Sequence, residues 1–319
     1  MALGDVRSAL AAIALAVLSA CGTNQQVKAP DASSVEPPSV AATAAETARF
    51  AEIVAAHNVR ASRLETLESR ASLELRYTDQ DGDHFDQCEA DIFLASGGRG
   101  ALRATKVGNN ILWVGSDGNR GWIFRLDGKP TRLTVFEGIG ALPPGQRLAG
   151  DGAAEFTLLS PRAVRTIAGI APIAEGWQLR PIEGVSGASP AESRFELVSA
   201  LAGNSDAVFR FTKGGLPESV RIEPRGAEPV LIAALSEYVP AQAENLSQGA
   251  WPQVPRKIVV TGVAASGAKD SEARLYLDVP IAMAKRIKPR FFVLEELVGQ
   301  LRPDAVEHIV VGAGADEQQ

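Results

Sequence analysis

The sequence has few of the residues on which metal and nucleophilic chemistry usually depend. It contains two cysteines, Cys21 and Cys88, and three widely separated histidines in 319 residues. An all-thiolate zinc site needs four cysteines, and one cysteine pair would not make a disulfide scaffold. No Gly-x-Ser-x-Gly turn occurs, and the string Ser266–Lys269 lacks the companion motifs of serine acyl-enzymes. We therefore predict that the protein is not an enzyme, with no catalytic residue, no metal and no cofactor.

Positive charge is also scarce. The chain has 32 Lys and Arg against 38 Asp and Glu, which leaves a net charge of −6. A nucleic-acid-binding protein of this size is usually basic, so we expect no nucleic-acid partner. The composition, 45% hydrophobic and 22% charged, is that of a globular protein.

The apolar run at the start of the chain is short. It covers residues 9–18, whereas a membrane-spanning helix needs about 20 apolar residues. With Arg7 before it and small residues after it, the run has the layout of a secretory signal peptide over residues 1–20. We expect export across the inner membrane.

The run ends in Leu18-Ser19-Ala20-Cys21, which resembles the bacterial lipobox. The resemblance implies diacylation of the Cys21 thiol, cleavage before Cys21 and acylation of the new amine. Two or three acyl chains give the double signal that stable membrane anchoring requires. Gly22, in the place where an Asp would retain the protein at the inner membrane, implies sorting to the periplasmic face of the outer membrane. The alternative is an ordinary signal peptide with a chance cysteine.

Residues 21–45 form a predicted tether, because Gly, Ser, Pro, Gln and Ala dominate and no apolar periodicity occurs. The folded part should be one domain over residues 46–319. The spacing from Thr43 to Glu46 is that of a capping box and predicts a helix over 46–67. His57 lies on the apolar stripe of this helix. We interpret it as a hydrogen-bonded histidine at the core boundary, in preference to a ligand or proton carrier.

From residue 70 the hydrophobic period changes to two, which predicts strands. Six consecutive strands form a meander over 70–136, and a helical insert with a proline-started helix at Ser160 follows over 137–175. Further strands, a helix over 290–301 and a last strand near 308–311 fill residues 176–312. The predicted fold is mainly β (α+β). It is a large curved antiparallel sheet or incomplete barrel of about 11–13 strands, covered by the N-terminal helix and the insert. A two-sheet sandwich is the alternative.

The order of helix, six strands, helical insert and more strands resembles the LolA/LolB-like lipoprotein-carrier fold. The best local match is the segment 111–124, Ile-Leu-Trp-Val-Gly-Ser-Asp-Gly-Asn-Arg-Gly-Trp-Ile-Phe, with an aromatic residue in each of two strands. The strand 73–77, Leu-Glu-Leu-Arg-Tyr, also fits. The resemblance implies an apolar concave face that receives acyl chains. It identifies no counterpart of the family's lid-closing arginine.

Alternation along the strands assigns a set of apolar residues to the inward face. They either fill a solid core or line an acyl-binding cavity, and both arrangements predict the same pattern. The candidates are Leu73, Leu75, Tyr77, Ile92, Trp113, Trp122, Phe124, Phe209 and Phe211. Cys88 shares an apolar strand face, so we expect a buried and inert thiol.

These observations lead to one main hypothesis and one alternative. The main hypothesis is a lipid-anchored envelope protein that binds acyl chains or lipoproteins in an apolar cavity and acts in lipid or lipoprotein trafficking. Its partners would be the membrane, through the lipid on Cys21, and an acyl ligand. The alternative is a structural or interaction lipoprotein of the envelope that has no ligand cavity.

Overall fold

A computed structural model describes most of the chain beyond the predicted tether. The described residues are 41–79, 82–139, 159–182, 194–201, 205–225, 231–263 and 269–310. The predicted signal peptide, the lipobox residues Leu18, Ser19, Ala20 and Cys21, and Gly22 lie outside them.

The first described helix, α2 (Ala44–Arg63), has the capping box that the sequence indicated. The Thr43 hydroxyl accepts a hydrogen bond from the Glu46 N–H (3.2 Å), and the Glu46 carboxylate accepts one from the Thr43 N–H (2.8 Å). The helix ends at Arg63, earlier than the predicted 67. Leu64 and Leu67 are both buried, at the helix C-cap and the start of the first strand, so the apolar pattern continues across the junction.

The strands of the described residues all belong to one sixteen-stranded sheet. Along the path of the sheet, the order is β16-β6-β5-β4-β3-β2-β1-β14-β13-β11-β10-β9-β8-β7, and the short strands β12 and β15 pair off it. The strands are β1 (Leu67–Asp79), β2 (Gly82–Leu94), β3 (Gly100–Lys106), β4 (Asn109–Ser116), β5 (Gly121–Arg125), β6 (Arg132–Glu137), β7 (Gln178–Pro181), β8 (Phe195–Ala200), β9 (Ser205–Phe211), β10 (Pro217–Pro224), β11 (Leu231–Pro240), β12 (Gln242–Ala243), β13 (Gln253–Val263), β14 (Lys269–Leu277), β15 (Ile281–Ala282) and β16 (Ala305–Val310).

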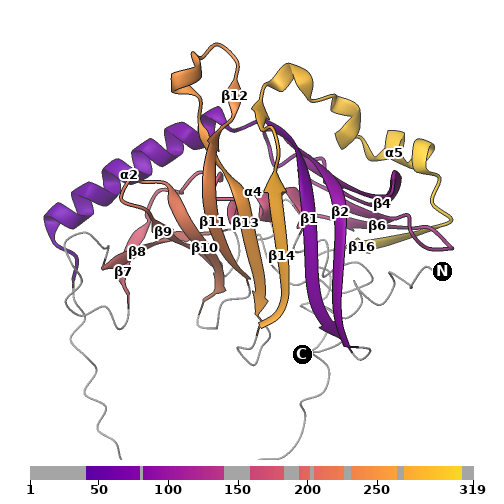
Figure 1. The fold of residues 1–319 in the computed structure, drawn as a ribbon, viewed down its shortest axis with the longest axis horizontal. Helices are drawn as coiled ribbons and strands as arrows, with labels where there is room; N and C mark the ends of the chain where they lie inside the picture. Colours follow the sequence, from indigo (N-terminus) through magenta and orange to yellow (C-terminus); the bar gives the residue numbers. More distant parts are fainter. Residues whose placement is uncertain are drawn as a thin grey trace, which may run out of the picture.

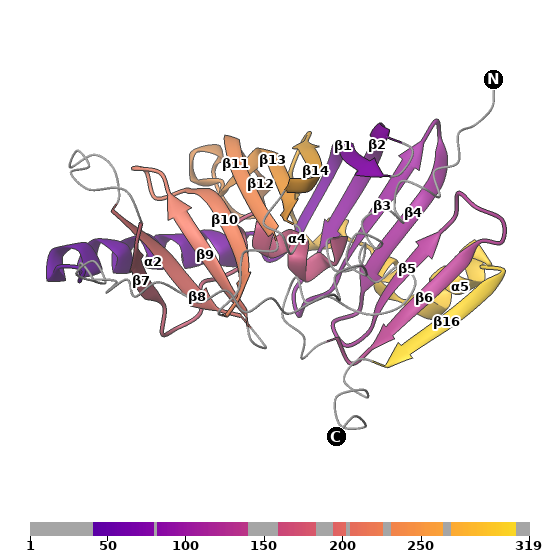
Figure 2. The same cartoon turned by 90° about the horizontal axis from the view of Figure 1, so that it is seen from below.

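Two antiparallel meanders make up this sheet. One is β1–β6 and the other is β7–β11, and β13 and β14 join them by pairing β14 with β1 in the register Leu73↔Leu275. The joined sheet curves strongly and is not closed, with β7 and β16 as its edge strands (Figures 1 and 2). The predicted fold class, an incomplete barrel with helical cover, is confirmed.

The sheet differs from the prediction in two details. It contains more strands than the 11–13 expected, partly because β12 and β15 have two residues each and leave no periodic pattern. It is also mixed rather than wholly antiparallel, since β16 runs parallel to β6 and β12 parallel to β15. The helix before β16 carries the chain back to the far edge of the sheet, and such a crossover permits parallel pairing.

Short helices complete the fold. They are α4 (Pro161–Ile167), η2 (Gln248–Ala250), η3 (Ala284–Arg286), η4 (Pro289–Phe292) and α5 (Leu294–Leu301). Helix α4 starts as predicted, with Ser160 as N-cap and Pro161 in its first turn. Gly169 follows it at φ +62°, where an L side chain would be strained, and a Cβ there would also crowd Leu235 (2.9 Å) and Pro217 (3.1 Å).

The two faces of the sheet carry separate apolar clusters. The inner cluster runs along the sheet under α2 and α4 and includes Phe50 and Ile167 from these helices. The outer cluster lies on the opposite face of β2–β6, under η4 and α5, and includes Phe292 and Leu297. In Figure 2, α4 lies between the two arms of the curved sheet. The inner face is therefore the concave face with a helical cover.

Candidate functional site

The inner face of the sheet is a continuous apolar surface. Its buried residues extend from Phe136 on β6, through Leu73 on β1 and Ile258 on β13, to Leu197 on β8. Partly buried Ile309 on β16 and Leu179 on β7 pack against it at the two edges. This inner face and the two helices that cover it form the candidate site.

The predicted cavity residues divide between the two faces. Leu73, Ile92, Phe209 and Phe211 are buried in the inner cluster. Trp113, Trp122 and Phe124 are buried in the outer cluster instead. The structure therefore does not bring all of the candidates together on one surface.

The sequence prediction placed the two tryptophans on the same face as Leu73. Alternation shows which residues of one strand share a face, but it does not show which face of the sheet that is. On β5, Trp122, Ile123 and Phe124 are all fully buried, and Ile123 is the one that belongs to the inner cluster. Both faces of this strand are covered, so the polar alternation that would identify the inward face is missing. The side chains of Leu75 and Tyr77 lie outside those that the structure describes.

Helix α2 contributes both apolar and polar residues to the inner site. Phe50, Val54 and Ala61 are its buried apolar residues, and His57 and Arg60 are its buried polar ones. The stripe follows from helical spacing, because residues three and four apart share one face. Two polar groups on this stripe need hydrogen-bond partners, since an unpaired buried polar group is costly.

His57 finds its partners in the segment after α4 and on α2 itself. Its Nε2 lies 2.8 Å from the Ala171 carbonyl oxygen, and its ring packs edge-on against Phe209 and Phe211, with centroids 5.9 and 6.0 Å away. Burial lowers the pKa of His57 to about 4, although the hydrogen bond to the Ala171 carbonyl favours the charged form and acts in the opposite direction. The ring is therefore neutral near pH 7. The hydrogen-bonded boundary histidine is the interpretation that this geometry matches.

Arg60 is a buried cation whose hydrogen bonds go to neutral groups. It donates to the carbonyl oxygens of Gln253 (2.9 Å) and Gly169 and to His57 Nδ1 (3.1 Å). Because a guanidinium can only donate, Nδ1 accepts and the proton of His57 sits on Nε2. The side chain is 8% exposed, and burial lowers the pKa of Arg60 below its usual value. Its Nε has no partner among the described residues.

Two more side chains bind the same helices together. Asn58 on α2 donates to the Ile173 carbonyl (3.0 Å) and accepts from the Ile173 N–H (2.8 Å). Arg165 on α4 donates to the carbonyls of Leu64 (3.1 Å) and Glu65 (2.7 Å) at the end of α2. We call the hydrogen bonds of His57, Asn58, Arg60 and Arg165 the cover contacts. They hold α2 against α4 and the segment 169–173.

Sequence reasoning missed Arg60 and Arg165. A weak signal was present for Arg60, which follows His57 by three residues and therefore shares its buried face. No signal was present for Arg165, because its partners are backbone carbonyls about 70 to 100 positions away.

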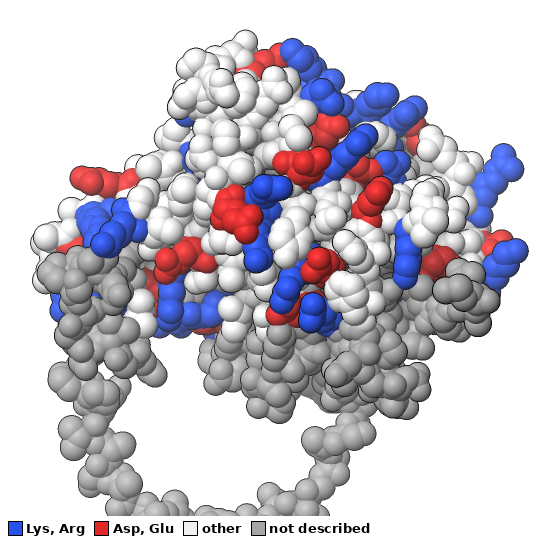
Figure 3. Space-filling view, viewed as in Figure 1, with Lys and Arg blue, Asp and Glu red and all other residues white. Residues whose placement is uncertain are grey.

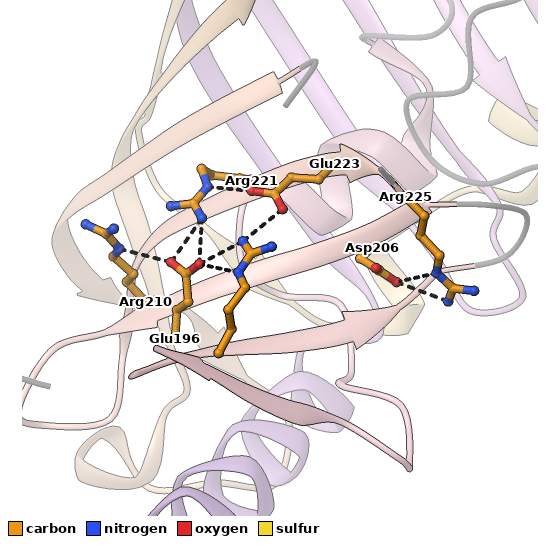
Figure 4. A network of polar contacts seen from close by, with 7 residues as sticks. Glu196, Asp206, Arg210, Arg221, Glu223 and Arg225 are labelled. Atoms are coloured by element: carbon orange, nitrogen blue, oxygen red, sulfur yellow. Dashed lines mark hydrogen bonds and ion pairs between the residues drawn. The ribbon is translucent and has the colours of Figure 1, made fainter. Parts of the chain in front are cut away.

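The outer face of the second meander carries a buried charge network (Figure 4). Glu196 on β8 has a 5% exposed side chain and pairs with Arg180 (2.7 Å), Arg221 (2.8 Å) and Arg210 (3.4 Å). Glu223 pairs with Arg180 and Arg221, both at 2.8 Å. Burial would raise the pKa of Glu196, but hydrogen bonds from Arg180 and Arg221 outweigh it and lower the pKa. The network joins four neighbouring strands.

The described part of the chain shows neither a metal site nor a membrane-spanning helix. No group of three or more His, Cys, Asp or Glu side chains there is placed to hold a metal ion. No helix among those residues is long and apolar enough to cross a membrane. Cys88 is buried, with 9% of its surface exposed.

Comparisons with known proteins find similarity of fold and none of sequence. No protein-family model and no curated protein matches the chain. Solved structures with a similar fold include one described as an outer-membrane lipoprotein-sorting protein domain from Vibrio parahaemolyticus, with 10% identity, a TM-score of 0.49, and coverage of 77% of this chain and 97% of that one.

Two further structures are similar to the same degree, each with 10% identity and a TM-score of 0.47. A LolA superfamily protein from Nitrosomonas europaea is matched over 75% of this chain and 97% of its own. A DUF1329 family protein from Desulfovibrio piger is matched over 76% and 98%. The order that the sequence indicated, a helix, a first meander, a helical insert and a second group of strands, is the order found in this chain.

Proposed function

We propose that the protein is a lipid-anchored, non-enzymatic envelope protein that binds acyl chains or lipoproteins on its inner face. The observation that carries this proposal is the nature of the cover. The described part of the inner face carries a continuous apolar cluster, and α2 and α4 are held over it by apolar packing together with hydrogen bonds to backbone groups. The cover contacts themselves include no ion pair, and the pair that Glu46 in the first turn of α2 makes with Arg194 (2.7 Å) can persist when they open.

The magnitudes allow an acyl chain to replace the cover. Each cover contact contributes about 1 kcal/mol to stability, or about 2 kcal/mol where a guanidinium donates. A buried CH₂ group contributes about 0.8 kcal/mol, so about ten methylenes offset the loss of several such contacts. Opening also leaves carbonyl groups that can bind water. We infer that α2 separates from the segment 169–173 when an acyl chain enters.

The anchor and the location belong to the same proposal. Lipidation of Cys21 would hold the protein at the periplasmic face of the outer membrane, and the sorting residue would be Gly22. Because α2 starts at Ala44, the folded domain begins two residues earlier than predicted, within the last two residues of the predicted tether. Acyl binding close to a membrane would suit a role in lipid or lipoprotein trafficking.

The environment of His57 supports a non-enzymatic role. Both of its ring nitrogens are engaged, one by the Ala171 carbonyl and one by Arg60. Its burial keeps it neutral, and its neighbours in the ring contacts are Phe209 and Phe211. A histidine whose two ring nitrogens are both hydrogen-bonded in this way is suited to a structural role.

The test of the binding proposal compares two valines on α2. Val54 is buried against the inner face and Val59 is 52% exposed on the same helix. Val54→Trp should place a bulky ring between α2 and the inner face, where an acyl chain would have to enter, and reduce uptake of a fluorescent fatty acid by the full chain at least about tenfold. Val59→Trp is the matched control and should bind like the wild type. Circular dichroism confirms that both variants fold.

Lipid extraction and mass spectrometry of the purified protein give an independent measurement. Copurified acyl lipids in near-stoichiometric amount are expected. Protein that is consistently free of lipid and takes up no fatty acid would overturn the proposal. It would favour the structural lipoprotein without a cavity, for which the close packing of His57 against Phe209 and Phe211 already provides some support.

A further inference from the structure

The outer face carries a small charged groove on the other side of the sheet from the inner site. Its volume is about 400 Å³, and it lies between β1–β3 and the η3–η4 segment. The residues that line it are Glu68, Ser69, Arg70, Asp91, Phe93, Arg103, Arg286, Lys288 and Phe291. A larger groove of about 800 Å³ shares Arg70, Asp91 and Arg103 with it.

The small groove has more cations than carboxylates. Arg103 pairs with Asp91, and Arg286 pairs with Glu68 at 3.0 Å. The remaining two cations, Arg70 and Lys288, are exposed and have no carboxylate partner among the described residues. Four cations and two carboxylates give the groove a charge of +2, on a chain whose net charge is −6.

The segment along one side of the groove extends this positive charge. Residues 279–294 contain no Asp or Glu, and besides Arg286 and Lys288 of the groove they carry Arg290 and Lys285, of which Lys285 pairs with Glu244 at 2.7 Å. In Figure 3, Lys and Arg side chains gather at the upper right, where Figure 1 places this segment. Local basic charge of this kind is invisible in the overall composition.

Apolar surface lies beside the cations. Phe291 packs against Phe93 with ring centroids 4.5 Å apart, and the Arg290 guanidinium lies 5.9 Å from the centre of the Phe291 ring. Val279, at the start of the same segment, is 61% exposed. Cations next to exposed apolar and aromatic groups are typical of surfaces that bind the membrane interface.

We propose that this groove and the η3–η4 segment bind the anionic headgroups of membrane lipids. Arg70 and Lys288 would donate hydrogen bonds to the lipid phosphate, for which a guanidinium offers paired donors and an ammonium offers a point charge. The groove lies on the opposite face from the inner site, so both can be occupied together. The proposal rests neither on the lipid anchor nor on acyl binding.

The experiment measures vesicle binding without the anchor. The full chain carrying Cys21→Ser is sedimented with phosphatidylcholine vesicles, with and without phosphatidylglycerol. Binding should require phosphatidylglycerol and weaken as salt rises. Arg70→Glu with Lys288→Glu should weaken binding at least about 30-fold, because each cation near an anionic surface contributes about a fivefold factor.

The matched control makes the same charge change elsewhere. Arg49 on α2 and Lys213 between β9 and β10 are exposed, far from the groove along the sheet, and have no ion pair in the described structure. Arg49→Glu with Lys213→Glu should bind much more tightly than the groove variant. Equal loss in both variants would mean that net charge alone drives binding, and would overturn the proposal.

Two further results would also overturn it. One is equal binding to vesicles with and without phosphatidylglycerol. The other is displacement by inorganic phosphate at constant ionic strength, which would mean that the groove takes a free phosphate group. If the charge-reversal variant does not fold, Arg70→Gln with Lys288→Gln replaces it and should still weaken binding about 25-fold.

Discussion

His57 and Arg60 show how two polar residues on the buried side of one helix can be accommodated. Each binds the backbone of a segment more than a hundred residues away, and they bind each other. Their arrangement requires a neutral imidazole, because a protonated ring would place two positive charges 3.1 Å apart in a buried site. This requirement can be tested at each of the two residues.

Stability should depend on pH through His57. Its pKa is lowered from 6.5 to about 4 by burial, so between these values the unfolded chain binds a proton that the folded chain does not. The free energy of unfolding should therefore be highest above pH 6.5. It should fall by about 3 kcal/mol in total as the pH drops toward 4. Urea unfolding from pH 4.5 to 8 measures it. His57→Gln should flatten this dependence, and an unchanged slope in the variant would contradict the assignment.

Loss of Arg60 should loosen α2. Arg60→Met leaves the carbonyls of Gln253 and Gly169 without a donor, at a cost of about 3 kcal/mol. Hydrogen exchange of α2 amides should accelerate more than exchange in β1 and β2. Arg63→Met, on the exposed side of the helix, is the control and should change stability by less than about 0.5 kcal/mol. Equal effects of the two variants would show that the cover contacts contribute little.

At the scale of elements, the strands β7–β10 are joined on their outer face by charge and on their inner face by apolar packing. Alternation along these strands places Glu196, Arg210, Arg221 and Glu223 together on one side, and the strand register then brings them into contact. Glu196 is the central acceptor of this network. A buried acceptor with several cations around it is costly to remove.

Glu196→Gln should therefore destabilise the second meander. The variant keeps the shape of the side chain but removes the charge that Arg180 and Arg221 face, and we expect a loss of about 2 kcal/mol in the free energy of unfolding. Asp206→Asn is the matched control, because its pair with Arg225 is more exposed and should contribute less than about 1 kcal/mol. Chemical denaturation at low and high salt measures both. The prediction fails if the two losses are equal.

At the scale of the whole molecule, one sheet presents two different faces. The inner face is apolar and covered by α2 and α4, and the outer face combines an apolar patch under α5 with polar grooves and the charge network. These two faces would give the protein separate surfaces for the proposed acyl ligand and for the proposed membrane contact. Attachment to the membrane itself is expected from Cys21.

Replacement of Cys21 should release the protein from membranes. Without its thiol the chain cannot accept the diacyl group, and two or three acyl chains are what makes anchoring stable. Cys21→Ser should shift the protein from the membrane fraction to the soluble fraction in physiological salt, and metabolic labelling with palmitate should be lost. Wild-type protein that incorporates no palmitate would show that the lipobox resemblance is misleading.

Much of the fold could be predicted because its signals are local. Thr43 and Glu46 specify the start of α2 within one turn, Ser160 and Pro161 specify the start of α4, and alternation marks most strands. The residues of the candidate site were harder to predict from the sequence. Trp122 and Phe124 lie on a strand covered on both faces, so their pattern does not identify the inner side. Arg60 and Arg165 bind backbone carbonyls, which have no sequence signature.

Most of the elements, their order and the polar face of each half-exposed strand could be predicted from the amino-acid sequence, because they depend on spacings of two to four residues. The lipobox resemblance, which stays a prediction, and the acidic balance of the chain also come from the sequence alone. The three-dimensional arrangement alone reveals that β14 pairs with β1, that α5 covers the outer face and β16 returns to β6, and that Arg70 and Lys288 share a groove. Those arrangements join residues more than a hundred positions apart, and no local pattern records which distant strand or helix will be the neighbour.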